Sequence, residues 1–194
     1  MCLKILEDSR LYALLLKFDR DLAELARVAG CACGGALHRA SYPRKPRTGA
    51  RVAQPDGYDR RHSFCCAEDG CRRRTTPASV RFLGPKVYLG VVVALVTALR
   101  HGANGRRAGE IRRAIGASRR TLARWRTWWR ETFTTTPFWR TARARWVPPV
   151  SEAAMPGSLL ERFAEEEGVM RLVRLLDFVK PVTTSSGGRI SMGV

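Results

Sequence analysis

The sequence predicts a mainly α-helical protein that contains a small β insert. Apolar residues recur at helical spacing near both ends of the chain, and a central segment is rich in both tryptophan and arginine. A Gly-, Pro- and Arg-rich stretch holds five of the six cysteines and is too broken for long helices. A chain of 194 residues is long enough for one ordinary domain or for two small units that share a core.

The chain begins with an amphipathic helix from Ser9 to Ala29, which Gly30 ends. Its apolar stripe is Leu11, Leu14, Leu15, Phe18, Leu22 and Leu25. The whole pattern predicts five parts: an N-terminal helix (residues 1–30), a basic cysteine segment (31–84), a central helical region (85–147), a C-terminal helix (148–180) and a disordered tail (181–194).

The later helices follow from start and stop signals. We expect a helix from Pro85 to about Arg100, then a break at "HGANG". The final helix should start with Ser158 as its N-cap and run toward Lys180, where Pro181 stops it. Its broad apolar surface predicts either packing on the N-terminal helix or homodimerisation.

The charge of the chain is strongly positive and unevenly placed. Thirty-five Lys and Arg against 17 Asp and Glu give a net charge of +18. From Arg106 to Arg145, twelve arginines face two glutamates, a net of 12 − 2 = +10. Such a charge favours a polyanionic partner.

The longest apolar run, Val87 to Leu99, is shorter than the roughly 20 residues of a membrane span. At the N-terminus Glu7 and Asp8 precede a short apolar run, where a signal peptide would have basic residues, so we expect a cytoplasmic protein without a membrane partner.

The cysteine segment predicts a metal site. Two groups of thiols, "CACGG" and "FCCAEDGC", lie about thirty residues apart, and Zn²⁺ is commonly held by four such thiolates. The predicted ligands are Cys31, Cys33, Cys66 and Cys71. Cys65 is the alternative to Cys66, His38 and His62 are further candidates, and free thiols are the simpler interpretation. Cys2 receives no role.

A second basic stretch, "SYPRKPRTG", lies between the two thiol groups. Its prolines favour an extended backbone that presents Arg44, Lys45 and Arg47 at short intervals. These cations would suit a phosphate backbone or a narrow minor groove, and a solvated loop is the alternative.

The central region predicts two short helices, and the second has an apolar face and a basic face. Ile111 and Ile115 share one side of the first helix, Gly116 ends it, and Ser118 caps a second helix that begins at Arg119. On the second helix Leu122, Trp125 and Trp129 point inward, with Trp128 at the edge, and the arginines point outward.

This helix, turn and helix predict a helix-turn-helix whose second helix enters the major groove of duplex DNA. Arg119, Arg120 and Arg124 would approach bases, because the planar guanidinium can bond two acceptors of guanine. Contacts to phosphates are expected from the flanking residues Arg112, Arg113, Arg126 and Arg130. A solvated arginine face is the alternative.

Apolar residues around Gly116 resemble the helix-turn-helix pattern, and they are Ile111, Ile115, Ala117, Leu122 and Trp125. The wider combination of "CxCGG", "YPRKPR", "CC" and "CRRR" with "GASRRTLARWRTWWRE" resembles small zinc-ribbon and helix-turn-helix proteins of bacterial mobile elements, relatives or accessories of insertion-sequence transposases. That resemblance implies a zinc-ribbon-like insert, double-stranded DNA as partner, a separate transposase, and a role in transposition or transcription regulation.

No arrangement of acidic residues suggests a two-metal nuclease, so we expect a binding protein and no enzyme. A catalytic subunit of a transposase or of a tyrosine or serine recombinase is one alternative, because the chain has four tyrosines and many arginines. An RNA-binding protein is another, since exposed arginines also suit RNA.

Overall fold

The structure is a computed structural model and describes residues 3–44, 52–83, 90, 92–93, 105–166 and 168–184. Lys45, Arg47, Cys2 and residues 185–194 of the expected tail lie outside these ranges. So does most of the helix expected from Pro85 to Arg100, of which Gly90, Val92 and Val93 are described and helical.

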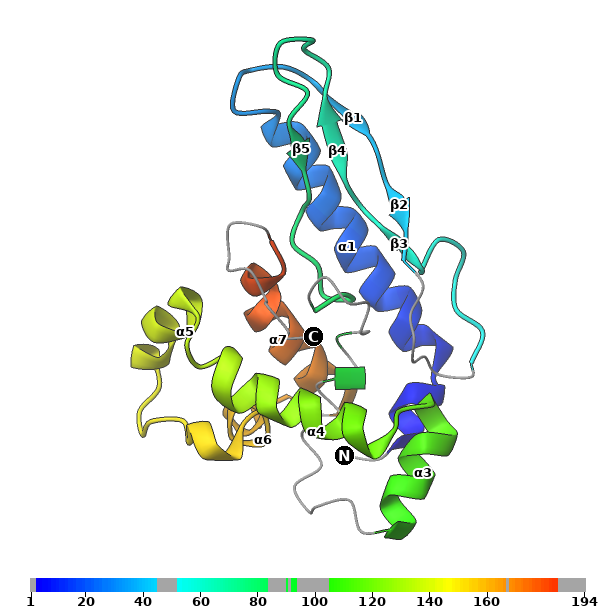
Figure 1. Cartoon of the computed structure of the whole chain (residues 1–194), viewed down its shortest axis with the longest axis vertical. Helices are drawn as coiled ribbons and strands as arrows, with labels where there is room; N and C mark the ends of the chain where they lie inside the picture. Colours follow the sequence, from blue (N-terminus) through cyan, green and yellow to red (C-terminus); the bar gives the residue numbers. More distant parts are fainter. Residues whose placement is uncertain are drawn as a thin grey trace.

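A long helix, α1 (Ser9–Ala29), connects two parts of the molecule (Figure 1). It follows a 3₁₀ turn at Leu3–Glu7. Asp8 caps its start by accepting a hydrogen bond from the Arg10 N–H at 2.9 Å. Gly30 ends it with φ 71°, which confirms the predicted bounds. The N-terminal half of α1 lies in a body of helices, and its C-terminal half extends outward beside the strands.

The β insert is formed by short antiparallel strands from the cysteine segment. Strands β1 (Leu37–Arg39), β4 (Phe64–Cys66) and β5 (Arg74–Thr75) form a sheet in the order β1-β4-β5. A second ladder pairs β2 (Tyr42–Pro43) with β3 (Arg60–Arg61). These strands and the C-terminal half of α1 form what we call the arm (residues 20–44 and 52–76).

The rest of the described chain forms the body. It contains α3 (Gly105–Ile115), α4 (Arg119–Thr127), a π-helical turn (Trp128–Thr132) and α5 (Pro137–Ala142). Then follow α6 (Gly157–Leu160) and α7 (Gly168–Val179). Short 3₁₀ turns lie at Arg143–Arg145, Glu152–Ala154, Glu161–Phe163 and Lys180–Thr183. The chain is therefore mainly α with small antiparallel sheets, as the sequence predicts.

The body and the arm each have an apolar cluster, and Tyr58 of the arm packs into the body cluster. In the body, the first half of α1, the helix pair α3 and α4, and α7 contribute to one continuous cluster. The buried apolar face of α7 belongs to this cluster, which favours intrachain packing as the explanation of that face. The arm has a much smaller cluster, formed by Ala23, Cys31, Leu37, Phe64 and Cys66.

The predicted stripe of α1 is wrong at its far end, where Leu25 is 68% exposed. In the structure the buried positions of α1 are Leu11, Tyr12, Leu15, Leu16, Asp19 and Ala23. Beyond Asp19 the helix leaves the body, so only the small side chains of Ala23 and Ala26 pack against the arm. The outer turns of α1 therefore have no core that could bury Leu25.

The expected single C-terminal helix is also wrong. The chain forms α6, a 3₁₀ turn and α7, and Gly168 at φ 51° begins the last helix. Ser158 is not an N-cap, because its Oγ donates to the Ser151 carbonyl at 2.6 Å and Pro156 holds the cap position. The expected disorder from residue 181 is wrong for residues 181–184, where Val182 is buried and the Ser79 N–H donates to Thr183 Oγ1 at 2.9 Å.

Candidate metal centre and basic helix pair

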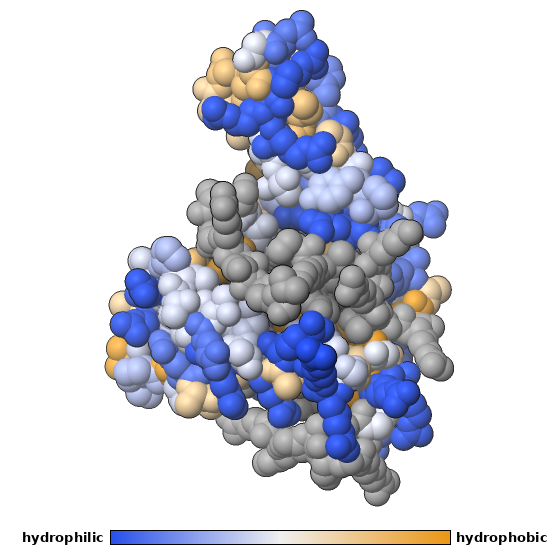
Figure 2. All heavy atoms as spheres, viewed as in Figure 1, coloured by the Kyte–Doolittle hydropathy of each residue, from blue (hydrophilic) through white to orange (hydrophobic). Residues whose placement is uncertain are grey.

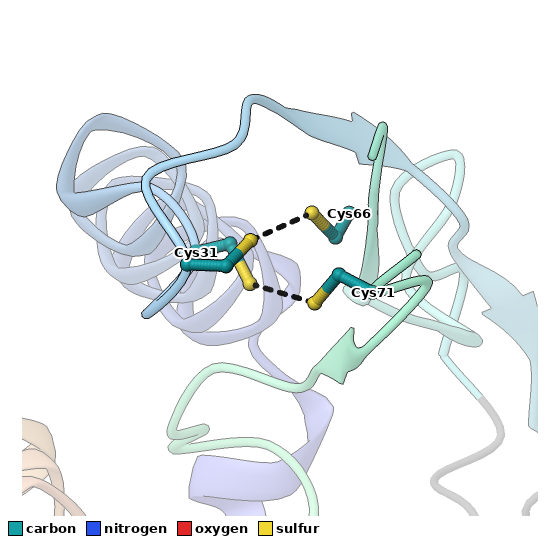
Figure 3. A group of neighbouring side chains, drawn as sticks. Cys31, Cys66 and Cys71 are labelled. Atoms are coloured by element: carbon teal, nitrogen blue, oxygen red, sulfur yellow. Dashed lines mark hydrogen bonds between the residues drawn. The ribbon is translucent and has the colours of Figure 1, made fainter. Parts of the chain in front are cut away.

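The four predicted cysteines come together at the outer end of the arm. The sulfur atoms of Cys31, Cys33, Cys66 and Cys71 all lie within 4.8 Å of one another. Cys31 Sγ is 3.7 Å from Cys71 Sγ, and Cys33 Sγ is 3.5 Å from Cys66 Sγ. Figure 3 shows Cys31, from the turn after α1, facing Cys66 of β4 and Cys71 of the turn that follows β4. A tetrahedral site with metal–sulfur bonds of about 2.3 Å places its sulfurs about 3.8 Å apart. The cluster therefore has the size of a tetrahedral thiolate site.

Two tight turns place these thiols. At the first, the Gly34 N–H donates to the Cys31 carbonyl at 2.8 Å and the Cys31 N–H donates to the Gly35 carbonyl at 3.1 Å. At the second, which follows β4, the Cys71 N–H donates to the Glu68 carbonyl at 3.0 Å. The predicted groups "CACGG" and "FCCAEDGC" thus form two facing turns in place of regular CxxC knuckles.

Backbone amides in these turns point at the sulfurs. Cys31, Cys66 and Cys71 each accept a hydrogen bond from the backbone N–H two residues further on, at Cys33, Glu68 and Arg73. Hydrogen bonds from the Cys33 N–H and from neighbouring thiols lower the pKa of the Cys31 thiol to about 7. Burial and the neighbouring thiols instead raise the pKa of Cys66 and of Cys71, despite their backbone hydrogen bonds. Cys31 is therefore the thiol most readily converted to the thiolate, which is the form that binds metal.

The register of the sheet decides between the alternative ligands. Side chains alternate along a strand, so Cys65 points to the face of β4 opposite from Cys66. Cys65 Sγ instead donates to the Arg72 carbonyl at 3.4 Å, and His38 pairs with Cys65 across the sheet. Among the described residues the metal-capable group contains neither Cys65, His38 nor His62. Cys66 is therefore the member that belongs to the cluster.

Gly35 has no side chain, and the thiols lie in the space that a side chain there would occupy. A Cβ atom at this position would lie 2.8 Å from Cys66 Sγ and 3.4 Å from Cys33 Sγ. We predict that Gly35→Ala weakens metal binding at least tenfold, because the sulfurs must move apart, and competition with a chromophoric chelator measures this. Gly70→Ala is the matched control, since a Cβ there meets nothing within 4 Å. Equal losses in the two variants would contradict the prediction.

The helix pair α3 and α4 meets at a tight turn with the predicted signals. The Gly116 N–H donates to the Arg112 carbonyl at 2.8 Å, and Gly116 has φ 70°. Ser118 Oγ then accepts from the Thr121 N–H at 3.2 Å and caps α4. The five apolar residues predicted to be buried around the glycine are all buried: Ile111, Ile115, Ala117, Leu122 and Trp125.

The arginines predicted on this pair lie mainly on its outer side. Arg126 is half-buried, and the other six are exposed: Arg112, Arg113, Arg119, Arg120, Arg124 and Arg130. Trp129 is fully buried as expected, but Trp128 is not at the edge, because it is 3% exposed. The π-helical turn that starts at Trp128 changes the angular step between residues, so both tryptophans reach the core. Arg44 lies in the arm, where its Nη2 donates to Tyr42 Oη at 3.2 Å.

A buried charge network at the junction of arm and body was missed by the sequence reasoning. Arg81 Nε donates to Asp19 Oδ2 at 2.8 Å, and both side chains are fully buried. Asp19 also accepts from Ser79 Oγ at 2.5 Å and from the Val80 N–H at 2.8 Å. Arg81 donates to the carbonyls of Tyr58 at 2.5 Å and Arg60 at 3.0 Å. The spacing of Asp19, four residues after the buried Leu15, is the sequence signal that would have found it.

Comparisons with protein-family models, with curated proteins and with solved structures gave no match for this chain. In the part of the chain that the structure describes, every helix is too short or too polar to cross a bilayer. The geometry of the thiol cluster and of the helix pair therefore carries the functional argument.

Proposed function

We propose that this protein binds duplex DNA in a sequence-dependent manner through a helix-turn-helix formed by α3 and α4. One observation carries the proposal: the apolar pattern around Gly116 is buried while the arginines of the same two helices face outward. A short first helix, a glycine turn and a capped second helix are the parts of this motif, and its second helix reads the major groove.

The charge of the helix pair supports a nucleic-acid partner. Arg112, Arg119 and Arg120 form no ion pair within the described residues, and Figure 2 shows strongly hydrophilic side chains over this part of the molecule. Uncompensated cations at short intervals attract a phosphate backbone. Arg119 and Arg120 occupy the first turn of α4, which is the part of a recognition helix that contacts base edges.

The buried tryptophans favour duplex DNA over RNA. Sequence-specific RNA binding commonly uses exposed aromatic rings on which unpaired bases stack. Trp125, Trp128 and Trp129 are each at most 4% exposed, so they stabilise the core of the helix pair instead. The outer face of α4 offers guanidinium groups, which suit guanine edges and phosphates.

We further propose that the thiol cluster binds zinc in a structural role. Four cysteine thiolates in a closed tetrahedral arrangement form a common structural zinc site. Cys31, Cys33, Cys66 and Cys71 would hold the ion, which would connect the end of α1 to the sheet. The arm has only a small apolar core, so the metal would supply the stability that this core lacks.

A selection from a random duplex library at about 150 mM salt tests the DNA proposal, since such salt weakens nonspecific phosphate binding. We expect one enriched motif. Arg120→Ala should relax the preference at one or two positions, at a cost of about 1–3 kcal/mol in binding free energy to the selected site. The selected motif and the affinities for its single-base variants measure this effect.

Arg130→Ala is the matched control, because Arg130 is exposed beyond the end of α4. It should weaken binding to all sequences alike and reduce the slope of log affinity against log salt by about 1. Equal effects of both substitutions on every sequence would contradict the assigned roles. Preference for single-stranded RNA over duplex DNA would overturn the proposed function itself.

A further inference from the structure

Outside the helix pair, the arm carries a second cluster of cations around one tyrosine. Arg44 Cζ lies 5.1 Å from the centre of the Tyr42 ring, and Arg74 Cζ lies 5.6 Å from it. Arg60 lies on the neighbouring strand β3, where its Nη2 donates to the Ser41 carbonyl at 2.8 Å. We call Tyr42, Arg44, Arg60 and Arg74 the tyrosine patch.

We propose that the tyrosine patch is a second binding surface for the phosphate backbone of duplex DNA, separate from α4. This inference rests on the proposed function for its DNA partner. Tyr42 keeps two guanidinium groups close to its ring, which limits their freedom before binding. Arg60 and Arg74 are exposed and form no ion pair within the described residues.

The chemistry of the patch favours phosphates over unpaired bases. A ring that stacks on bases must present an open face, whereas the Tyr42 ring is half-buried and already contacts two arginines. The patch therefore offers positive charges, and positive charges contact the backbone of a duplex without reading its sequence. Its expected contribution is to affinity and to salt dependence.

One arginine of the patch, Arg74, lies on the sheet next to the thiol cluster, whereas Tyr42 and Arg60 lie on the β2–β3 ladder. Arg74 lies directly opposite Cys65 in the β4–β5 ladder, and the next residue of β4 is Cys66 of the metal centre. The patch lies along the arm, away from α4 (Figure 1). Helix α1 begins in the body and ends in the arm, and its 21 residues span about 30 Å. Contacts at both surfaces would therefore cover more DNA than α4 alone.

The test measures binding of the full-length, metal-loaded protein to a random-sequence duplex of about 40 base pairs at several salt concentrations. The variant carries Arg60→Ala and Arg74→Ala. We expect the slope of log affinity against log salt to fall by about 2, since each phosphate contact contributes about 0.9. On a selected site, hydroxyl-radical protection should shrink on one side while the motif stays the same.

The matched control carries Arg27→Ala and Arg72→Asn, which remove the same charge from the arm. These arginines already pair with acids, Arg27 with Glu24 and Arg72 with Asp69, and asparagine tolerates the φ of 43° at position 72. For this control variant the slope of log affinity against log salt should fall by less than 1. Equal slopes for the patch variant, the control and the unchanged protein would overturn the second surface. If the patch variant lowers the salt slope only with a single-stranded probe and not with the duplex, the patch binds RNA or single-stranded DNA, and the proposed duplex surface is overturned.

The two proposals fail in different ways. If α4 does not read sequence, no motif emerges from the selection, yet the patch variant still loses its salt slope on random duplex. If the patch is not a binding surface, the motif and its loss on Arg120→Ala remain while the patch variant behaves like its control. Melting temperature and metal content of each variant separate both outcomes from misfolding.

Discussion

Asp19→Ala should lower the free energy of unfolding by about 3–5 kcal/mol, because it leaves the buried guanidinium of Arg81 without its counter-charge. The substitution also removes the acceptor of the Ser79 hydroxyl and the Val80 N–H. Urea denaturation of the full chain, followed by tryptophan fluorescence, measures the change. The tryptophans lie in the body core, to which the first half of α1 also belongs, so the signal reports on that core.

The double variant Asp19→Leu with Arg81→Met separates the charge from the packing. It should recover part of the lost stability, since apolar residues of similar volume often replace a buried ion pair without loss. Recovery should be incomplete, because Ser79 and Val80 still lose their acceptor. Arg27→Ala, which breaks an exposed pair in the same helix, should leave unfolding unchanged. A small effect of Asp19→Ala would mean that water reaches Arg81 and that the junction is open.

The local features of the fold could be predicted from the sequence because neighbouring residues determine them. The spacing of leucines and the position of Gly30 give the bounds of α1, and Gly116 with Ser118 gives the turn between α3 and α4. The thiol cluster was predictable because cysteine is scarce and chemically specific. The choice of Cys66 over Cys65 needed the strand register, which shows which of two adjacent side chains points inward.

The failures of sequence reasoning come from contacts between distant segments. Asp19 and Arg81 lie 62 positions apart, and neither residue alone indicates the other. The π-helical turn at Trp128 appears where the mutual packing of three aromatic rings, Trp128, Trp129 and Phe133, outweighs regular helical spacing. The interruption between α6 and α7 likewise follows from tertiary packing, because "SLLE" is a valid capping box as a local pattern.

Cys66→Ser should abolish stable metal binding and unfold the arm while the body keeps its structure. Structural zinc contributes about 10–16 kcal/mol to small domains, and one lost thiolate removes much of that affinity. The outer part of the arm has only a small cluster of its own, of which Cys66 is a member, whereas the body core contains Tyr58 but none of the cysteines. The readouts are metal content after dialysis and amide exchange, which should accelerate in β1 and β4 but not in α7.

Cys65→Ser is the matched control, because Cys65 neighbours Cys66 in the chain and points away from the cluster. It should keep its metal and its amide protection. Equal metal loss in both variants would contradict the ligand set, and unchanged exchange in β1 and β4 after metal removal would show that the sheet folds unaided. Arg74 of the tyrosine patch lies on β5, which pairs with β4, so Cys66→Ser should also lower the salt slope of DNA binding, but by less than the patch variant does. The sequence motif read by α4 should survive, since the helix pair belongs to the body core.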